Sequence, residues 1–368
     1  MSFNKKIIIG ARGSRLSLAY ANYAKKLIIQ NNQLNERESS ILLALVDCYI
    51  DKSIPISSKL IKNSFDFNIS SATIRSAMAL LEDKGYLTHL HTSGGRIPTD
   101  LGYRYYVNNL NYSNELDIEL SNFIEYELKI INSNVDELLG ATAIMLSKIS
   151  KMFGVVSISG YQSSILTDIE LISIQGNRVM LVLAMDTGLV KSIVLNLKIN
   201  ISDHLITKIT TVLKESLVGC TLQEIQSTII GRLSDAEMYD HELVQILVND
   251  RFNFFNIDSN NSIYTSPSNV LLKHPEFQNI TQYQKILPAL DKTYLSEHFN
   301  QNFTNEVDKT LIGSENGDKI LYDCSIVTSH FDQGKVKGRI GIIGPKRIPY
   351  LYIQNLLNKF TEVIINAY

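Results

Sequence analysis

The alternation of apolar and polar positions predicts three short helices between residues 35 and 85. The first helix, over residues 35–52, can be capped by Asn35 or Ser39, and the second follows a turn at Pro55, with Ser57 as its cap. The apolar residues of the first helix recur at helical spacing and form one face: Ile41, Leu42, Leu45, Val46 and Tyr49. This pattern is typical of helices that pack on one side against a small core.

The third helix has the clearest pattern. Its cap is Ser70 or Ser71, and Gly85 follows its end in the position that favours a left-handed backbone. The apolar stripe has i, i+3, i+4, i+7 spacing and consists of Ile74, Ala77, Met78 and Leu81. The residues predicted to face outward are Arg75, Ser76, Ala79 and Glu82.

A two-stranded ribbon is predicted directly after this helix. The stretch "YLTHLHTSGGRIPT" alternates apolar and polar residues, turns at Gly94 and Gly95, and returns through Ile97 to Pro98, which stiffens the exit. Three short helices followed by a ribbon are the elements of a winged helix-turn-helix. The sequence therefore predicts a DNA-binding domain near the N-terminus.

The rest of the chain predicts a mixed α+β fold. Residues 103–152 have helical patterning, residues 168–197 contain three strand-like runs separated by turns, and residues 202–232 and 236–256 are again helical. Two further strands, "CSIVTSHF" and "GRIGIIG", precede a closing helix. Helices segregated from antiparallel strands indicate an α+β multidomain protein.

The composition is that of an ordinary globular protein and excludes several classes. The 368 residues suggest two or three domains, the net charge is −2, and the apolar runs are too short to span a membrane. The three cysteines, Cys48, Cys220 and Cys324, are far apart, which favours a reducing cytoplasm over disulfides or a zinc site. The sequence has no catalytic constellation and no phosphate-binding loop, and "GRIGIIGPKR" is interpreted as a buried strand and turn. We therefore expect a regulator without enzymatic activity, metal or cofactor.

The first 32 residues differ in charge from everything that follows. They carry six basic side chains and no acidic one. Over about twenty residues, around "ARGSR", they resemble the start of porphobilinogen deaminase, in which such a loop handles substrate carboxylates; nothing downstream resembles that enzyme's catalytic segments. A basic N-terminal extension, residues 1–34, is the alternative interpretation.

The stretch "ISSATIRSAMALLEDKGYLTHLHTSGGRIPTDLGYRYYV", residues 69–107, closely resembles the matching segment of the HrcA family of bacterial heat-inducible transcription repressors. The chain departs from the family pattern at Gly94, where the family usually has Ala. The resemblance continues more loosely to residue 368 through "AMDTGLVKS", "SNVLLKHPEF", "DCSIVTSHF" and "GRIGIIGPKRIPY".

This resemblance implies a domain organisation and a set of partners. It implies a winged helix-turn-helix domain over residues 35–105, a GAF-like α+β domain over 106–215 and 295–368, and an inserted dimerisation segment over 216–294. It implies a cytoplasmic homodimer that binds an inverted-repeat operator in double-stranded DNA and represses chaperone operons. It also implies that the chaperonin GroEL keeps the repressor active and that heat stress releases it from DNA.

The candidate DNA-binding residues lie on the third helix, on the ribbon and just beyond it. A recognition helix presents its N-terminal residues to the base edges, and Arg75 can bind guanine O6 and N7 with two hydrogen bonds. The full set is Ser71, Thr73, Arg75, Ser76, His91, Thr92, Ser93, Gly95, Arg96 and Arg104. Ser70 or Ser71 can cap the helix or bind a phosphate, and His91 can be a half-buried structural histidine or a DNA contact. We expect Arg96 to reach a phosphate or the minor groove.

The balance of charge in this region restricts how it can form a DNA-binding face. Residues 33–110 hold eight basic and eight acidic residues, so a DNA-binding face must come from their arrangement or from the basic extension. The tyrosines at 103, 105 and 106 are interpreted as packing residues. An alternative function is a winged-helix regulator that responds to a small ligand in the GAF-like domain.

Overall fold

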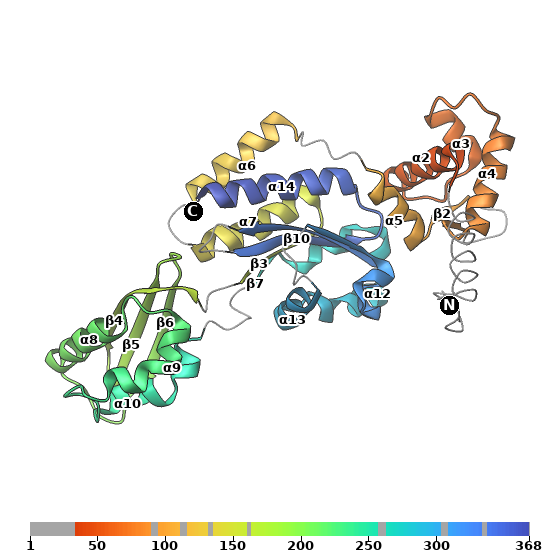
Figure 1. Cartoon of the computed structure of the whole chain (residues 1–368). Coiled ribbons are helices and arrows are strands. Elements are labelled where there is room, and N and C mark those ends of the chain that lie inside the picture. The colour runs from red at the N-terminus through yellow and green to blue at the C-terminus, as the bar shows by residue number, and fades with distance from the viewer. Residues whose placement is uncertain are drawn as a thin grey trace, which may run out of the picture. The chain divides into compact units, whose positions relative to one another are not determined.

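The computed structural model describes residues 34–89, 95–110, 116–131, 135–159, 163–256, 263–302, 308–332 and 337–367. The chain divides into two compact units, residues 1–110 and 111–368. Both contain helices and antiparallel strands, which confirms the predicted α+β class (Figure 1). Among the residues that are described, no helix has the length and apolar character needed to cross a membrane.

The first unit contains the three predicted helices, the ribbon and a fourth helix. In chain order these elements are α2 (Glu36–Lys52), α3 (Ser58–Ser64), α4 (Ser71–Asp83), β1 (Leu87–Thr88), β2 (Ile97–Pro98) and α5 (Asp100–Asn108). Helices α2, α3 and α4 pack on one another. The predicted apolar stripe of α4 is buried throughout, as is most of the predicted face of α2. These stripes form the core of the unit.

Local sequence signals set the helix ends. Asn35 caps α2 in a capping box with Glu38, Ser57 caps α3, and Ser70 caps α4 by accepting the N–H of Thr73 at 3.1 Å. Gly85 has φ +82°, and the N–H groups of Gly85 and Tyr86 donate to carbonyls in the last turn of α4. Because only glycine adopts this backbone without strain, α4 ends there.

The ribbon is short and is held from outside. Leu87 pairs with Pro98 and Thr88 with Ile97 in antiparallel register. Arg96 adds a further bridge to Ile56, between α2 and α3, with N···O distances of 2.8 and 2.9 Å. A Cβ on Gly95 would lie 2.5–2.6 Å from the backbone of Pro55 and Ile56. Glycine is therefore required here so that the ribbon can approach this turn.

The second unit is built on a five-stranded antiparallel sheet with the order β7-β3-β10-β9-β8. Strand β3 pairs with β7 through contacts such as Val155–Thr265, although these residues are far apart in the sequence. The strands are β3 (Phe153–Ser159), β7 (Ile263–Thr265), β8 (Lys309–Ile312), β9 (Cys324–Asp332) and β10 (Lys337–Pro345).

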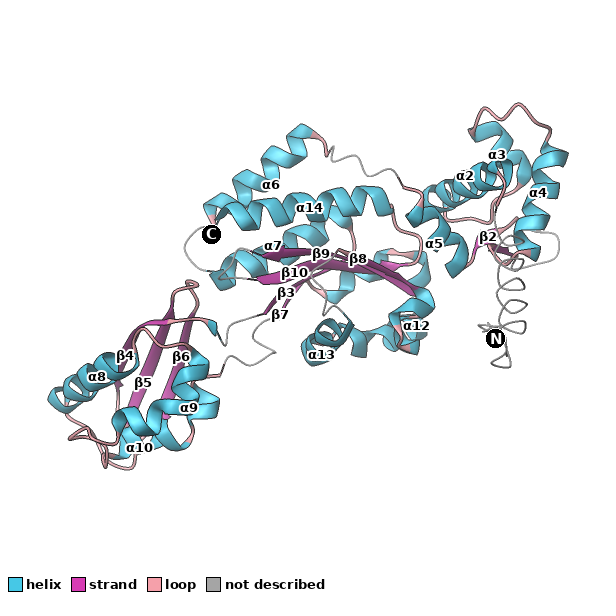
Figure 2. Cartoon of the chain, viewed as in Figure 1, coloured by secondary structure: helices cyan, strands magenta, loops and turns pink. Residues whose placement is uncertain are grey.

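Helices cover both faces of this sheet. Helices α6 (Ile118–Ile130), α7 (Val135–Ser150) and α14 (Tyr350–Ala367) pack together on one face, and α12 (Ile280–Ile286) and α13 (Lys292–Asn302) lie on the other (Figure 2). Short 3-10 turns complete the second layer: η3 (Ser268–Lys273), η4 (Pro275–Phe277), η5 (Leu287–Leu290), η6 (Gly313–Asn316) and η7 (Lys319–Leu321). Strands β9 and β10 are therefore buried along almost their whole length.

The stretch "GRIGIIG" lies in β10, which confirms its interpretation as a buried strand. A Cβ on Gly338 would lie 2.3 Å from the carbonyl oxygen of Ser157 and 2.5 Å from the ring of Phe331. The glycine permits close packing between strands, and the stretch is not a phosphate-binding loop.

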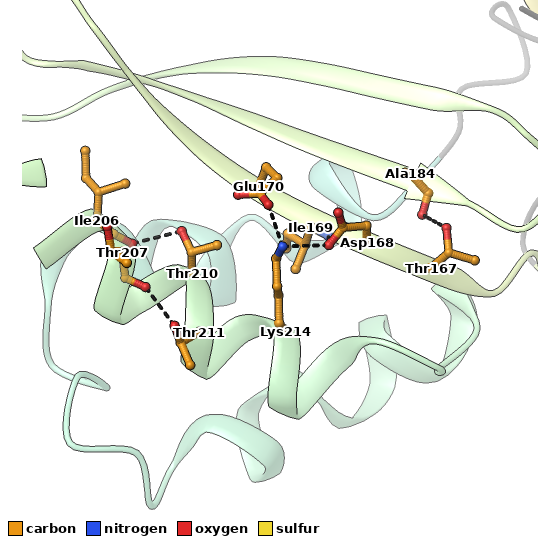
Figure 3. Close-up of polar contacts among 10 residues, drawn as sticks. All are labelled: Thr167, Asp168, Ile169, Glu170, Ala184, Ile206, Thr207, Thr210, Thr211 and Lys214. Atoms are coloured by element: carbon orange, nitrogen blue, oxygen red, sulfur yellow. Dashed lines mark hydrogen bonds and ion pairs between the residues drawn. The ribbon is translucent and has the colours of Figure 1, made fainter. Parts of the chain in front are cut away.

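Between β3 and β7 the chain forms a second sheet of three strands, β4 (Leu166–Ile174), β5 (Arg178–Met185) and β6 (Val190–Asn196). This is the predicted antiparallel meander. Helices α8 (Asp203–Leu217), α9 (Leu222–Leu233), α10 (Glu242–Asn249) and α11 (Arg251–Phe254) follow it. Helix α8 packs against β4, and Lys214 of α8 contacts both Glu170 and Asp168 on that strand, the latter at 2.9 Å (Figure 3).

Candidate nucleic-acid interface

Helix α4 places the predicted recognition residues along its N-terminal half. Arg75 and Ser76 are exposed, and Ser71 and Thr73 are half-buried. The Ser76 hydroxyl donates to the carbonyl of Ala72 at 3.1 Å. Arg75 lies opposite the buried stripe, as predicted, so its guanidinium is presented to solvent by a helix that the core holds in place.

The ribbon residues are only partly described. His91, Thr92 and Ser93 lie outside the described residues, and Gly95 and Arg96 lie at the base of the ribbon. Both are half-buried, and both lie against the turn at Pro55 and Ile56. The backbone approach that Gly95 permits is therefore an approach to another part of the same unit.

Glu82, near the end of α4, joins the two arms of the ribbon. Its Oε2 lies 2.6 Å from Nε of Arg96, which immediately precedes β2. Its Oε1 contacts Nδ1 of His89, which immediately follows β1. The Glu82 side chain is 22% exposed, so water only partly screens these contacts. The sequence pattern placed Glu82 on the outer face of α4 but gave no sign of either contact.

Arg104 and its neighbouring tyrosines lie on α5. Arg104 is half-buried. Tyr105 donates to Ser39 at 2.9 Å and packs edge-on against Tyr86, and Tyr106 donates to Asp47. These contacts attach α5 to α2, which confirms the tyrosines as packing residues.

The charged residues between 33 and 110 divide into those engaged within the fold and those left exposed. Glu38 is buried and binds Lys84 at 2.7 Å, and Glu82 binds Arg96, so two carboxylates are engaged within the fold. Exposed Lys59 and Lys62 on α3 and Arg75 on α4 make no ion pair within the described residues. Neither lysine is among the candidate DNA-binding residues predicted from the sequence. Their i, i+3 spacing on the helix before α4 was the available signal.

The buried Glu38–Lys84 pair ties the start of α2 to the end of α4. Burial acts to raise the pKa of Glu38, but the Lys84 ammonium and the Asn35 N–H, which both bind the carboxylate, outweigh burial and lower it. The carboxylate is thus held ionised in the core of the unit. This contact holds the C-terminal end of α4 against the start of α2.

The described residues contain no group of three or more His, Cys, Asp or Glu side chains placed to hold a metal ion. The three cysteines are buried and form no disulfide. Burial raises the pKa of the Cys324 thiol well above its ordinary range. A buried thiol of this kind is inert rather than nucleophilic.

Comparisons with known proteins identify the family of this chain. Residues 136–353 match the family model described as "HrcA protein C terminal domain". A heat-inducible transcription repressor HrcA of Clostridium acetobutylicum is 31% identical over 340 residues, which cover 91% of this chain and 97% of the relative. The corresponding repressor of Chlorobium phaeobacteroides is 30% identical over 343 residues, covering 90% and 97%. A crystal structure of a hypothetical protein at 2.2 Å matches with a TM-score of 0.65 and 21% identity, covering 91% of this chain and all of that one.

These relatives place the chain among transcription repressors and not among enzymes. The solved structure supports the fold alone. The chain belongs to the HrcA family of heat-inducible transcription repressors. An enzyme of porphobilinogen deaminase descent is set aside on this evidence, and the residues that suggested it lie outside the described part of the chain.

Proposed function

We propose that residues 35–105 form a winged helix-turn-helix that binds double-stranded DNA. The observation that carries this proposal is α4, whose outward residues begin with Ser71, Thr73 and Arg75 while its opposite face is wholly buried. Helix α3 precedes it and the β1–β2 ribbon follows it, with Ile56 as a third strand position against Arg96. In this arrangement α4 is the recognition helix and the ribbon is the wing.

Each part of the interface has a separate role. Arg75 reads a base edge, with Ser71, Thr73 and Ser76 beside it, because a guanidinium can donate two hydrogen bonds to guanine. Lys59 and Lys62 on α3 bind phosphates, as does Arg104. The ribbon meets the phosphate backbone with His91, Thr92 and Ser93, while Gly95 and Arg96 at its base hold it against the rest of the unit.

The repressor acts as a homodimer through the segment inserted into the five-stranded sheet. We place this segment between β3 and β7 rather than at 216–294, because the chain leaves that sheet at Ser159 and re-enters it at Ile263. One face of its own sheet is buried, but the other carries Ile172, Met180 and Val194 in one row across the three strands. Ile172 and Val194 are 46% and 49% exposed. An exposed apolar row of this kind is typical of a surface that binds another protein, and in this proposal it packs against the same row of a second copy.

The five-stranded sheet with its helices is the GAF-like domain in this proposal. The chain is a cytoplasmic negative regulator of chaperone operons, and its operator is an inverted repeat that matches the two-fold symmetry of the dimer. The chaperonin GroEL keeps the dimer competent to bind. On heat stress unfolded proteins occupy the chaperonin, and the operator is released.

Fluorescence anisotropy with three duplexes tests the proposal. The duplexes are the inverted repeat upstream of the organism's own chaperonin operon, one half-site and a scrambled sequence, each at two salt concentrations and with or without chaperonin. We expect tight binding only to the intact repeat, strengthened by chaperonin. Equal binding to all three duplexes would refute operator recognition, and strengthening by a metabolite instead of chaperonin would favour the small-ligand alternative.

Two variants separate base reading from phosphate binding. Arg75→Ala should cost about 1–3 kcal/mol and relax specificity at one base pair. Lys62→Ala should weaken binding similarly for all sequences and reduce the salt dependence, since each lost phosphate contact changes the slope by about 0.9. An unchanged specificity profile for Arg75→Ala would show that another face of α4 meets the bases.

A further inference from the structure

The ribbon has little intrinsic stability. Among the described residues, which leave out 90–94, two residue pairs join β1 and β2, and one of them includes Pro98, which has no N–H to donate. A two-stranded ribbon of this length is not stable by itself in water. Its direction relative to α4 must therefore be set by contacts outside the ribbon.

Those contacts meet at one carboxylate. Glu82 of α4 binds Arg96 on the returning arm at 2.6 Å and His89 on the outgoing arm. Both lie one position beyond the last pair, Thr88–Ile97, on the side toward the tip. The Arg96 backbone is held at the same time by its two hydrogen bonds with Ile56. Arg96 is thus fixed by its main chain to one element and by its side chain to another.

We propose that Glu82 is a positioning residue for DNA binding, which clamps both arms of the ribbon and fixes its angle to α4 through Arg96 and His89. This inference rests on the proposed function of the ribbon. It assigns the charge of Arg96 to Glu82 rather than to a phosphate, so Arg96 acts at the interface by holding the wing in register with the recognition helix. The clamp links the element that reads bases to the element that meets the backbone.

The two roles of Arg96 predict opposite results when Glu82 is removed. If Arg96 bound a phosphate, loss of the neighbouring carboxylate would strengthen DNA binding, because a negative charge next to the DNA would be gone. If Glu82 is a clamp, its loss weakens operator binding. Asp83 supplies the matched control, since it is the next residue of α4, is exposed, and makes no ion pair or side-chain hydrogen bond within the described residues.

The experiment measures operator and scrambled-duplex affinity, salt slope and thermal midpoint for the full-length chain. We expect Glu82→Ala and Arg96→Ala each to lower operator affinity about tenfold with an unchanged salt slope, and the double variant to be no worse than either, because contacting residues are not additive. Asp83→Ala should leave operator affinity within about twofold, in line with a surface substitution. Hydrogen exchange at Thr88 and Ile97 should accelerate in the Glu82 and Arg96 variants and stay unchanged in the Asp83 variant.

The charge swap Glu82→Arg with Arg96→Glu is decisive. A clamp is restored by the swap, so operator affinity should return to within about threefold of the wild type, whereas a phosphate contact would be replaced by a repulsive carboxylate. A swap no better than the single variants, or a salt slope that falls by about 2 per dimer in Arg96→Ala, would overturn the proposal. Wild-type chain that fails to prefer the operator would refute the proposed function instead, and hydrogen exchange would still report on the clamp.

Discussion

The two sheets of the second unit differ in how many of their faces are covered. Strands β9 and β10 of the five-stranded sheet lie between two helical layers and are buried at nearly every position. Strand β5 of the three-stranded sheet is just as apolar in sequence, but its residues alternate between buried and half-buried, and those of β6 between exposed and half-buried along most of its length. A half-covered sheet usually has a polar outer face. The row formed by Ile172, Met180 and Val194 on the uncovered face of β4–β6 departs from this rule, and the proposed dimer would cover it.

The largest effect should come from placing a lysine on the buried face of β6, in contrast to a lysine on its exposed face. Leu195 is 4% exposed and its neighbour Val194 is 49% exposed. Leu195→Lys should destabilise the unit by about 4 kcal/mol, because it buries a charge with no partner. Val194→Lys should change the thermal midpoint little and shift the dimer toward monomer by at least about tenfold, because a charge would enter the interface. Sedimentation at several concentrations checks this, and an unchanged dimer would move the interface elsewhere.

The packing of the five-stranded sheet can be tested with one methyl group. Gly338→Ala should cost about 3 kcal/mol, because its Cβ would overlap Ser157 and Phe331. The same substitution at Gly231 of α9, where a Cβ would have nothing within 4 Å, should stabilise by about 0.5–1 kcal/mol. Thermal unfolding of the two variants measures the difference. Equal midpoints would contradict tight packing around β10.

Two ion pairs, one beside each sheet, test the same difference in burial with a smaller expected loss of stability. Arg347 is 12% exposed and holds Glu276 with two contacts, Nε–Oε1 at 2.6 Å and Nη2–Oε2 at 3.2 Å, beside the five-stranded sheet. Arg347→Ala should cost about 2 kcal/mol, because a partly buried carboxylate loses a charged donor. Lys214→Ala, on α8 beside the edge strand β4, should change the thermal midpoint much less, since water screens its contacts with Asp168 and Glu170. A comparable loss in both variants would show that burial does not separate them.

The smallest effects should follow pH. The hydrogen bond from Lys359 lowers the pKa of Glu125, and the hydrogen bond from Lys214 lowers that of Asp168. Because a lowered pKa means the native state favours the carboxylate, each contact is fully present above the ordinary pKa, 4.5 for Glu and 3.8 for Asp, and is lost as the pH falls through the lowered value. Hydrogen exchange in α6 and β4 between pH 5 and 3 should show both losses, and Lys359→Met should abolish the one in α6. Persistence of the α6 response in that variant would exclude this pair as its source.

The sequence by itself determined the elements of the first unit, since their signals are local. Ser70 and Gly85 bound α4, and Ile74, Ala77, Met78 and Leu81 form its buried stripe, through interactions between residues a few positions apart. The outward position of Arg75 followed from the same periodicity. The individual strands β4–β6, β9 and β10 were also predicted, because alternation and turn residues are local signals too.

Only the tertiary structure decided which of these elements meet. Val155 pairs with Thr265 across the whole inserted segment, Arg96 pairs with Ile56, and Glu82 reaches both arms of the ribbon. Nothing local records such contacts, because they depend on the packing that brings distant segments together and on the loops that this packing closes. The limits predicted for the inserted segment, 216–294, depend on pairing of the same non-local kind, and the proposal sets them instead from the pairing of β3 with β7. Local patterns specify the pieces of this repressor, and non-local packing specifies their neighbours.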